Sequence, residues 1–564
     1  MASHSGEGNG KGDDSYYEEG CRNDASPNSL DAESVAFLEK EMAKFRQEFN
    51  LDKDALRAFV TDRRSAFVEK NAYDITQHLP GPADDSDVWD VIIEAREAFY
   101  RGATHTKWAE FSVKYGGSVL SNVVFPTVMG ARDFETGRFK RPVLCNLVVI
   151  ADPGDAARIT RLHVNKAPNF TPFFFNSIIS TTDRSHWEEQ RKNLVEGFLP
   201  VASLSKILPV SVARAQVAER LLSKASANGK NSIDMNDFLL NETMAQLMLA
   251  MFGVSQEFMD ENNKKFRDAM SGKRDPSFIS SYIPALVKEM GSATCPAGPL
   301  GAALSKLNPS KSKNLTTAGN AVIFSFAGHD TTGHTLTWAL FELSQHPRIQ
   351  DKLLEEVDNF WKLQRGKEMQ YQDLKGLDYM TRVITETLRL WPAVANGTFR
   401  KTTFEDTIKG PKGSNVRLPK GSFCVIPNWS RHRSKELWGD DANAFNPERR
   451  FTDGELYFGD GLRGYNPSSP RFSPFTFAPR DCIGKNFALM EMRVILLHLL
   501  RSFKFELAPE SRDFDRATYL GVNYGTLGPG DIQACPVKRF PVIGPAERIP
   551  LGLRFLAHSR SARL

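Results

Sequence analysis

One cysteine stands in a segment whose residue types suit metal chemistry. Cys482 follows the run Phe475-Thr-Phe-Ala-Pro-Arg-Asp and precedes Ile483-Gly484. Apolar residues at helical spacing fill 485–500, so Cys482 is predicted to lie at the N-terminus of a helix. The free N–H groups and the positive end of the helix dipole there are expected to lower the pKa of a thiol and favour the metal-binding thiolate. The alternative is a buried structural cysteine, the commoner role of a single cysteine.

This segment resembles the haem-binding loop of the cytochrome P-450 superfamily, Phe-x-x-Gly-x-Arg-x-Cys-x-Gly. Phe475, Arg480, Cys482 and Gly484 match it. The resemblance implies haem b as cofactor, Cys482 as the axial ligand of its iron, and Arg480 as a partner of a haem propionate. Ala478 stands where the family has glycine, and we expect altered hydrogen bonding around the thiolate in consequence.

A second motif lies in a predicted helix from about Thr316 to Pro347. It reads Ala327-Gly-His-Asp-Thr-Thr332 and is similar to the oxygen-activating helix of the same family. Four residues are expected on one face, directed at the iron, namely Phe324, Ala327, Gly328 and Thr331. The resemblance implies that Gly328 leaves room for dioxygen, that the Thr331 hydroxyl interrupts the helical hydrogen bonds, and that Asp330 and Thr331 are catalytic residues that deliver protons. The alternative is a buried helix with a solvated aspartate.

Two further segments resemble conserved parts of the family. Glu386 and Arg389, three residues apart on a helix that Pro392 ends, are expected to form a structural triad with Arg449 of the segment Phe445-Asn-Pro-Glu-Arg449. Trp187 and Arg191 match the Trp-x-x-x-Arg helix that crosses the haem edge, where both side chains can donate to a propionate. Ordinary packing is the alternative for that pair.

Another position departs from the family pattern. Many relatives place a propionate-binding His or Arg four residues after the proline that ends the Glu-Arg helix. This chain has Asn396 there, and Arg400 is the residue that could compensate.

The motifs run from Trp187 to Gly484 and cannot be divided between domains. The resemblance therefore implies one large, mainly helical catalytic domain with a small β region, over residues 79–538, with haem buried between the oxygen-activating helix and the helix that follows Cys482. Residues 1–30 are predicted to be disordered, 31–78 to form a helical extension and 539–564 a C-terminal tail. The extension is expected to dock onto the catalytic domain, with peripheral membrane contact as the alternative.

Electrons are expected to come from NAD(P)H through a separate partner. The extension is too short for a flavin reductase and the six cysteines show no iron–sulfur cluster, so a flavin reductase or ferredoxin-type donor is implied. The net charge is only 72 − 68 = +4, which argues against nucleic-acid binding. Lys485 and Arg493 follow the thiolate and are candidates for a basic patch that docks an acidic redox partner.

Composition also gives expectations about location. The scattered cysteines favour a reducing, intracellular compartment, and no N-terminal run approaches the ~20 apolar residues of a membrane span. A cytoplasmic or peripheral-membrane protein is therefore expected. The final Ala562-Arg563-Leu564 resembles a peroxisomal address, which also arises by chance. The sequence leaves the oligomeric state open.

The candidate substrate pocket is apolar. Phe174, Phe324 and Val394, together with Asn396, are expected to line it, which favours a hydrophobic substrate such as a fatty acid, another lipid, a terpenoid or a sterol. Arg400 is a candidate anchor for a fatty-acid carboxylate. We expect a haem-thiolate monooxygenase that hydroxylates a C–H bond. The alternatives are a haem-thiolate isomerase or dehydratase acting on peroxides without a reductase, and a non-catalytic haem sensor.

Overall fold

The structure is a computed structural model that describes most of the chain between residues 79 and 509 and one later strand. The described ranges are 79–81, 104–125, 143–167, 174, 176–270, 277–290, 292, 298–307, 315–456, 466–509 and 554–559. The predicted segments 1–30 and 31–78 and the C-terminal tripeptide lie outside these ranges.

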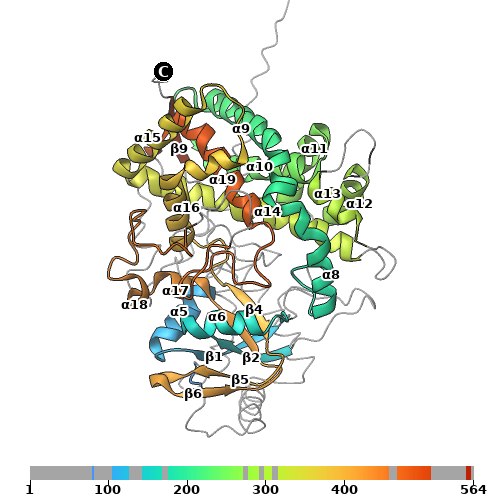
Figure 1. Ribbon diagram of the computed structural model, residues 1–564, viewed down its shortest axis with the longest axis vertical. Coiled ribbons are helices and arrows are strands. Elements are labelled where there is room, and N and C mark those ends of the chain that lie inside the picture. The colour runs from blue at the N-terminus through green and yellow to red at the C-terminus, as the bar shows by residue number, and fades with distance from the viewer. Residues whose placement is uncertain are drawn as a thin grey trace, which may run out of the picture.

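Helices form the larger part of the molecule, and most of the strands gather at one end of it, whereas the strand Arg554–Ser559 (β9) lies at the other end (Figure 1). This confirms the predicted mainly helical fold with a small β region. The helices that bear on the site are α8 Arg184–Leu194, α9 Ser205–Ser226, α10 Met235–Gln246, α14 Leu315–Gln345, α16 Asp378–Leu390 and α19 Lys485–Ser502. Around them lie α11 Gln256–Met270, α12 Ser277–Met290, α13 Pro299–Ser305, α15 Pro347–Gln364, α17 Asn428–Arg433 and α18 Lys435–Trp438. Short 3-10 or π-helical turns include η5 Val195–Phe198, η6 Pro200–Leu204 and η7 Leu247–Phe252.

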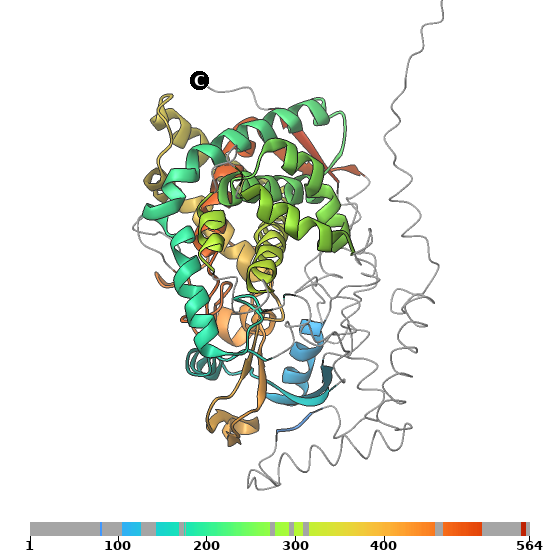
Figure 2. The same cartoon turned by 90° about the vertical axis from the view of Figure 1, so that its right-hand side faces the viewer.

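The β end is built on a four-stranded sheet of order β1-β2-β7-β4. Its strands are β1 Val119–Phe125, β2 Val143–Val149, β4 Thr398–Lys401 and β7 Phe423–Ile426, with α5 Thr104–Lys114 and α6 Pro153–Leu162 beside it. β2 and β7 run parallel, and the other pairs are antiparallel. A hairpin of β5 Asp406–Lys409 and β6 Asn415–Leu418 lies next to this sheet in both views (Figures 1 and 2).

The start of the expected domain lies against this sheet. Leu120 donates its N–H to the carbonyl of Pro80 at 2.8 Å. A Cβ atom on Gly81 would lie 2.0 Å from the Leu120 carbonyl oxygen, so only glycine allows the two backbones to approach this closely.

A third sheet corrects the predicted C-terminal boundary. β9 Arg554–Ser559 pairs antiparallel with β3 Ile233–Asp234 on one side and with β8 Phe503–Leu507 on the other. The predicted tail 539–564 therefore contains a strand of the folded body. The physical reason is that β8, which follows α19 directly, has an edge with which β9 can pair. A pairing between segments so far apart cannot be recognised from the six residues of β9 alone.

Proline sets two of the helix ends. The predicted helix from Thr316 to Pro347 is α14, which stops at Gln345, and Pro347 instead begins α15. His346 has φ −126° and ψ 73°, and Trp391, before Pro392, has φ −126° and ψ 63° at the end of α16. Both residues leave the helical region because the proline ring that follows crowds their backbone.

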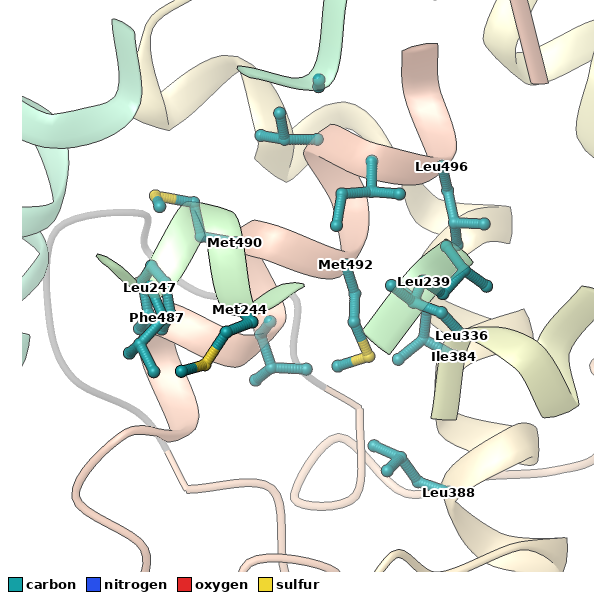
Figure 3. Packing of buried hydrophobic residues seen from close by; sticks show 14 of the residues in the cluster. Leu239, Met244, Leu247, Leu336, Ile384, Leu388, Phe487, Met490, Met492 and Leu496 are labelled. Atoms are coloured by element: carbon teal, nitrogen blue, oxygen red, sulfur yellow. The ribbon is translucent and has the colours of Figure 1, made fainter. Parts of the chain in front are cut away.

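Close packing of α14 against α10 forms the centre of the helical part. A Cβ atom on Gly328 would lie 2.8 Å from the Leu247 side chain, and one on Gly333 would lie 3.0 Å from the Leu240 Cα atom. Glycine at these two positions therefore lets the helices approach. Figure 3 shows Met244 of α10 and Leu247 of η7 beside Phe487 and Met490 of α19, and all four belong to one apolar core.

The triad of Glu386, Arg389 and Arg449 is brought together in the interior. Arg389 binds the Glu386 carboxylate through two nitrogens, at 2.7 and 2.8 Å, and Arg449 Nε lies 3.4 Å from it. Arg389 also donates to the carbonyl oxygens of His432 and Ala442. The triad thus joins α16 to α17 and to the segment that precedes the cysteine loop.

None of the described helices alone has both the length and the apolar character of a membrane span. The bent pair Arg184–Phe198 and Pro200–Ser226 satisfies those two conditions only when taken together.

Replacing Glu386 tests the triad. The variant Glu386→Ala should lower the free energy of unfolding by about 3–5 kcal/mol, because it leaves buried guanidinium groups without their carboxylate. Urea unfolding followed by circular dichroism measures the change. The control Glu188→Ala removes an exposed carboxylate that pairs with Arg184 at 2.8 Å, and its midpoint should stay near that of the parent protein. Equal shifts for the two variants would contradict a stabilising role for the triad.

Candidate functional site

The backbone of the cysteine loop folds back on itself before α19. Cys482 donates its N–H to the carbonyl of Phe475 at 2.9 Å, and the Gly484 carbonyl accepts the first helical bond, from Ala488, at 2.9 Å. Cys482 therefore lies three residues before Lys485, the first residue of α19, and close to the helix N-terminus as predicted. Thr476 has a positive φ of 57°, whereas Ala478 does not. The left-handed residue of the loop is thus Thr476, and alanine at 478 meets no backbone strain.

The electrostatics of Cys482 reverse one expectation. Its side chain is exposed. Even so, desolvation by the surrounding protein raises the pKa of the thiol, and nearby Lys485 and the Gly484 N–H only oppose this rise. Exposure combined with desolvation is expected of a side chain that lines an interior space. The prediction that the helix terminus lowers this pKa is wrong, because desolvation outweighs the dipole. Binding of a metal ion would stabilise the thiolate of Cys482, which the helix N-terminus alone does not achieve.

The middle of α14 is open on one side. Ala327, Gly328, Asp330 and Thr331 are partly exposed, whereas Val322–Phe326 and Thr332–Leu343 are buried. Partial exposure in the middle of a helix whose flanking turns are buried is expected where the helix lies beside an interior space. The Ala327-to-Thr331 motif is therefore a candidate wall of such a space.

Hydrogen bonds hold the polar pair of this turn. The Thr331 hydroxyl donates to the Ala327 carbonyl at 2.8 Å, and α14 continues unbroken through this point. The expected interruption of the helix is therefore not seen. His334 Nδ1 lies 2.7 Å from the Asp330 carbonyl and 3.6 Å from its carboxylate. Sequence reasoning missed His334, although its i, i+4 spacing from Asp330 is the signal that could have found it.

Gly328 has a packing role that the resemblance did not imply. The Leu247 side chain occupies the place where a side chain at 328 would project. The glycine therefore lets η7, which follows α10 directly, pack against α14. The predicted role of Gly328 beside dioxygen stays a prediction.

An aromatic contact connects the two motifs. The rings of Phe324 and Phe198 are 5.5 Å apart, and Phe198 also lies 3.6 Å from the position of a Cβ atom on Gly484. Phe324 thus points toward the cysteine loop. Phe174, the other predicted pocket phenylalanine, stacks on Phe326 with a centroid distance of 6.1 Å. The structure therefore places Phe324 and Phe174 in different contacts.

The helix with the Trp-Arg pair is joined to the cysteine loop through Asp481. Arg191 donates to the Asp481 carbonyl and to its carboxylate, both at 2.8 Å, and Lys485 lies 3.0 Å from the same carboxylate. Arg191 therefore positions the loop in this structure, and its contact with a propionate stays a prediction. Asp481 was not singled out from the sequence, although it lies within the motif.

The candidate basic patch is corrected by burial. Lys485 is paired with Asp481, and Arg493 donates to the Thr381 hydroxyl at 2.8 Å and to the Leu489 carbonyl at 2.9 Å. Both side chains are buried. They hold α19 in place and do not present charge to a partner.

Three cations lie buried near the loop without an acidic partner among the described residues. Lys166 Nζ and Arg400 Nη1 donate to the same Thr398 hydroxyl, at 2.8 and 2.6 Å. Burial, together with the charges of Arg400 and Arg480, lowers the pKa of Lys166 well below its usual range. Burial lowers the pKa of Arg400 to about 9, and burial plus the charge of Arg400 lowers that of Arg480 to about 9. We call these three residues the cation cluster.

Some N–H donors of the cation cluster have no acceptor among the described residues. Arg480 donates to the carbonyls of Val164, Ile178 and Thr181, and its guanidinium lies over the Trp187 ring at 5.3 Å. Arg480 Nε and Arg400 Nη2 are buried and have no hydrogen-bond partner among the described residues. Buried positive charge with unused donors fits an anionic group. The propionates of haem are such groups, so Lys166, Arg400 and Arg480 would hold them while Cys482 binds the iron.

The position of Arg400 in the cation cluster agrees with its predicted role as compensation for Asn396, and its contact with a propionate stays a prediction. Asn396 and Val394 are partly exposed, and Asn396 Oδ1 is buried without a partner among the described residues. Arg400 is fully buried beside two other cations. That position gives no support to its predicted role as an anchor for a fatty-acid carboxylate. Lys166 carried no signal in the sequence, because a single lysine in a loop has no distinguishing pattern.

Cys482 before α19, the Asp330-Thr331 turn of α14 and the buried cation cluster are the features expected of a haem-thiolate site. Residues 302–522 match the family model for cytochrome P450. The match covers 221 of the 564 residues, so this part of the chain is similar to the cytochrome P450 family, whose members bind thiolate-ligated haem.

Curated relatives share only part of their length with this chain. Secologanin synthase 2 of Catharanthus roseus is 37% identical over 188 residues, 33% of this chain and 32% of that protein. Cytokinin hydroxylase of Arabidopsis thaliana is 38% identical over 189 residues, 34% of this chain and 33% of that protein. Cytochrome P450 CYP13A5 of Caenorhabditis elegans is 34% identical over 193 residues, 34% of each chain. The matches therefore span about a third of each relative.

Replacing Lys166 tests the cation cluster. Lys166→Met should weaken haem binding by about 10- to 100-fold, because a hydrogen bond to a charged group contributes roughly 1.5–3 kcal/mol. The same change should make the haem-free protein more resistant to urea, since it removes an unpaired buried charge. Haem titration followed by absorbance and urea unfolding measure the two effects. Lys264→Met, at an exposed position on α11, is the control. Unchanged haem affinity in Lys166→Met would contradict the assignment.

Proposed function

We propose that this chain is a haem-thiolate monooxygenase, which inserts one oxygen atom of O2 into a C–H bond of a hydrophobic substrate. The observation that carries the proposal is the partly exposed turn of α14 that contains Asp330 and Thr331. Phe324, Phe198 and Gly484 connect that turn to the start of α19. The names of the relatives, a synthase and a hydroxylase, agree with oxidative chemistry.

The residues of this chain would divide the work as follows. Haem, when bound, supplies the iron at which dioxygen is reduced. Cys482 is the thiolate ligand, and the cation cluster neutralises the propionates. The Thr331 hydroxyl, held by the Ala327 carbonyl at 2.8 Å, can turn into the space and pass on a proton. Asp330 precedes Thr331 directly and supplies a carboxylate. His334, one helical turn further along α14, lies 3.6 Å from that carboxylate and restrains it.

The proposed substrate class rests on the residue types expected at the pocket. Phe174 and Phe326 stack on each other and are buried, and Val394 and Asn396 are partly exposed. An apolar lining with one amide would suit an apolar molecule with few polar groups. Electrons are proposed to come from NAD(P)H through a separate reductase or ferredoxin-type donor.

Coupling of oxygen consumption to product separates this proposal from its alternatives. The parent protein with NADPH and a reductase should consume O2 and release hydroxylated product. Thr331→Val keeps the side-chain shape but removes the hydroxyl, and should lower the product formed per O2 consumed by about 100-fold, a typical loss for a group that transfers protons. Oxygen uptake and product are measured together by electrode and mass spectrometry.

Thr337→Val is the matched control. Thr337 donates to the Gly333 carbonyl at 2.8 Å, the same bond that Thr331 makes, but it is fully buried. Its coupling should equal that of the parent protein. Peroxide rearrangement without NADPH would favour an isomerase or dehydratase, and haem binding without either activity would favour a sensor.

A further inference from the structure

An open pocket lies between α9 and α10, two helices that contact each other. Its volume of about 490 Å³ falls in the range of roughly 300–1,000 Å³ that small-molecule sites occupy. Residues of both helices line it, together with Asn231 from the connection between them. None of the residues assigned above to the haem site is among the described residues of this lining. The pocket is therefore separate from the haem site.

A buried arginine borders this pocket. Arg214 of α9 is 8% exposed, and its Nε donates to Glu242 Oε2 of α10 at 2.9 Å. Gln246 Nε2 holds the other oxygen of Glu242 at 3.1 Å. The two Nη nitrogens of Arg214 have no acceptor among the described residues, and neither is sealed in the interior. The guanidinium is thus fixed on one side and can donate on the other, which suits a carboxylate that accepts two parallel hydrogen bonds.

The charges around the pocket also favour an anion. Lys224 is exposed in the lining and has no ion pair among the described residues. Two cations, Arg214 and Lys224, therefore share the lining with one carboxylate, that of Glu242. Burial raises the pKa of Glu242 to about 7, against the opposing effects of Arg214 and Gln246. Near neutral pH, Glu242 thus offsets only part of the positive charge.

The C-terminal end of α9 would repel an anion through its carbonyl groups, but Asn231 caps it. The Asn231 N–H donates to the Ser226 carbonyl at 3.1 Å, and its Nδ2 donates to the Ala225 carbonyl at 3.0 Å. Asn241 of α10 is partly exposed in the lining, and its side-chain amide makes no hydrogen bond with a described residue. That amide can therefore donate to a ligand as well.

The rest of the lining is apolar. Leu221 of α9 is 46% exposed, and Phe238 of α10 is partly exposed. Removal of such surface from water by an apolar group is favourable. Because these side chains share one pocket with Arg214 and Lys224, a ligand needs both an anionic group and an apolar body to match the whole lining.

We propose that the pocket between α9 and α10 is a binding site for an organic anion, a carboxylate on an aromatic or aliphatic body. The carboxylate accepts hydrogen bonds from the Nη nitrogens of Arg214, with Lys224 beside it, and the body lies against Leu221 and Phe238. Arg214 is already held by Glu242, so little conformational freedom is lost when the anion binds. Binding is reversible and changes no covalent bond.

Calorimetric titration of the full-length, haem-loaded protein with 2-naphthoate tests the site. This probe joins one carboxylate to a fused aromatic ring, and it should bind the parent protein saturably. Arg214→Lys should weaken binding at least ~10-fold, because lysine keeps the charge beside Glu242 but lacks the planar fork. Equal affinities of the parent protein and Arg214→Lys would overturn the proposal.

Arg220→Lys is the matched control. Arg220 also lies on α9, but it is exposed and does not belong to the described lining, so its variant should bind 2-naphthoate as the parent protein does. Two further probes separate charge from apolar contact. 2-Naphthalenemethanol, which has the ring without the charge, and inorganic phosphate, which has charge without the ring, should each bind the parent protein at least ~10-fold more weakly. Binding of either as tight as that of 2-naphthoate would contradict the assignment.

Leu221→Ser tests the apolar side of the pocket at a position too exposed to disturb folding. It should weaken 2-naphthoate binding roughly 3- to 10-fold through lost apolar contact. Leu363→Ser, which changes a 77% exposed residue of α15, should have no effect. Equal affinities in these two variants would count against the proposal, as would a Soret shift that follows all of the binding and so places the probe at the haem. The titration needs no turnover, so its failure is distinct from failure of the monooxygenase proposal.

Discussion

The burial of Lys166, Arg400 and Arg480 without a carboxylate is the constraint on which the site depends. Desolvating three positive charges in mutual range is unfavourable unless an anion joins them. Among the described residues, the hydrogen-bond acceptors of this cluster are neutral, namely the Thr398 hydroxyl and backbone carbonyl oxygens. The protein thus keeps positive charge ready for an anionic cofactor, and the same loop presents Cys482. One region of the fold therefore supplies both the cations that would bind the haem carboxylates and the cysteine that would bind the iron.

Helix α14 serves three neighbours with three different faces. Gly328 packs against Leu247 of η7 and Gly333 against Leu240 of α10, Ala327 and Thr331 are partly exposed, and Thr332 lies near Glu491 of α19. Because successive residues of a helix project about 100° apart, adjacent positions can serve these separate neighbours. This arrangement explains how a helix buried in the core can also take part in chemistry. It also explains why a change at Gly328 would disturb packing as well as the site.

Local patterns made much of the architecture predictable. Helical spacing and prolines located α14, α16 and α19. The spacing of Glu386 and Arg389, with the family resemblance of the segment that ends at Arg449, anticipated a contact that the structure shows. Features that depend on long-range burial were not predictable. The raised pKa of Cys482 follows from the protein around it, and the burial of Lys485 and Arg493 follows from the packing of α19. The burial of Lys166, Glu242 and Glu491 likewise depends on packing against residues that are distant in sequence.

The most direct test of the account is the absorption spectrum of the ferrous carbon monoxide complex. The parent protein should show the red-shifted Soret band of thiolate-ligated haem. Cys482→Ala should lose that band, whereas Cys424→Ala, which changes a buried cysteine of β7, should keep it. An unchanged spectrum in Cys482→Ala, or no haem spectrum in the parent protein, would contradict the assignment of Cys482 as the iron ligand.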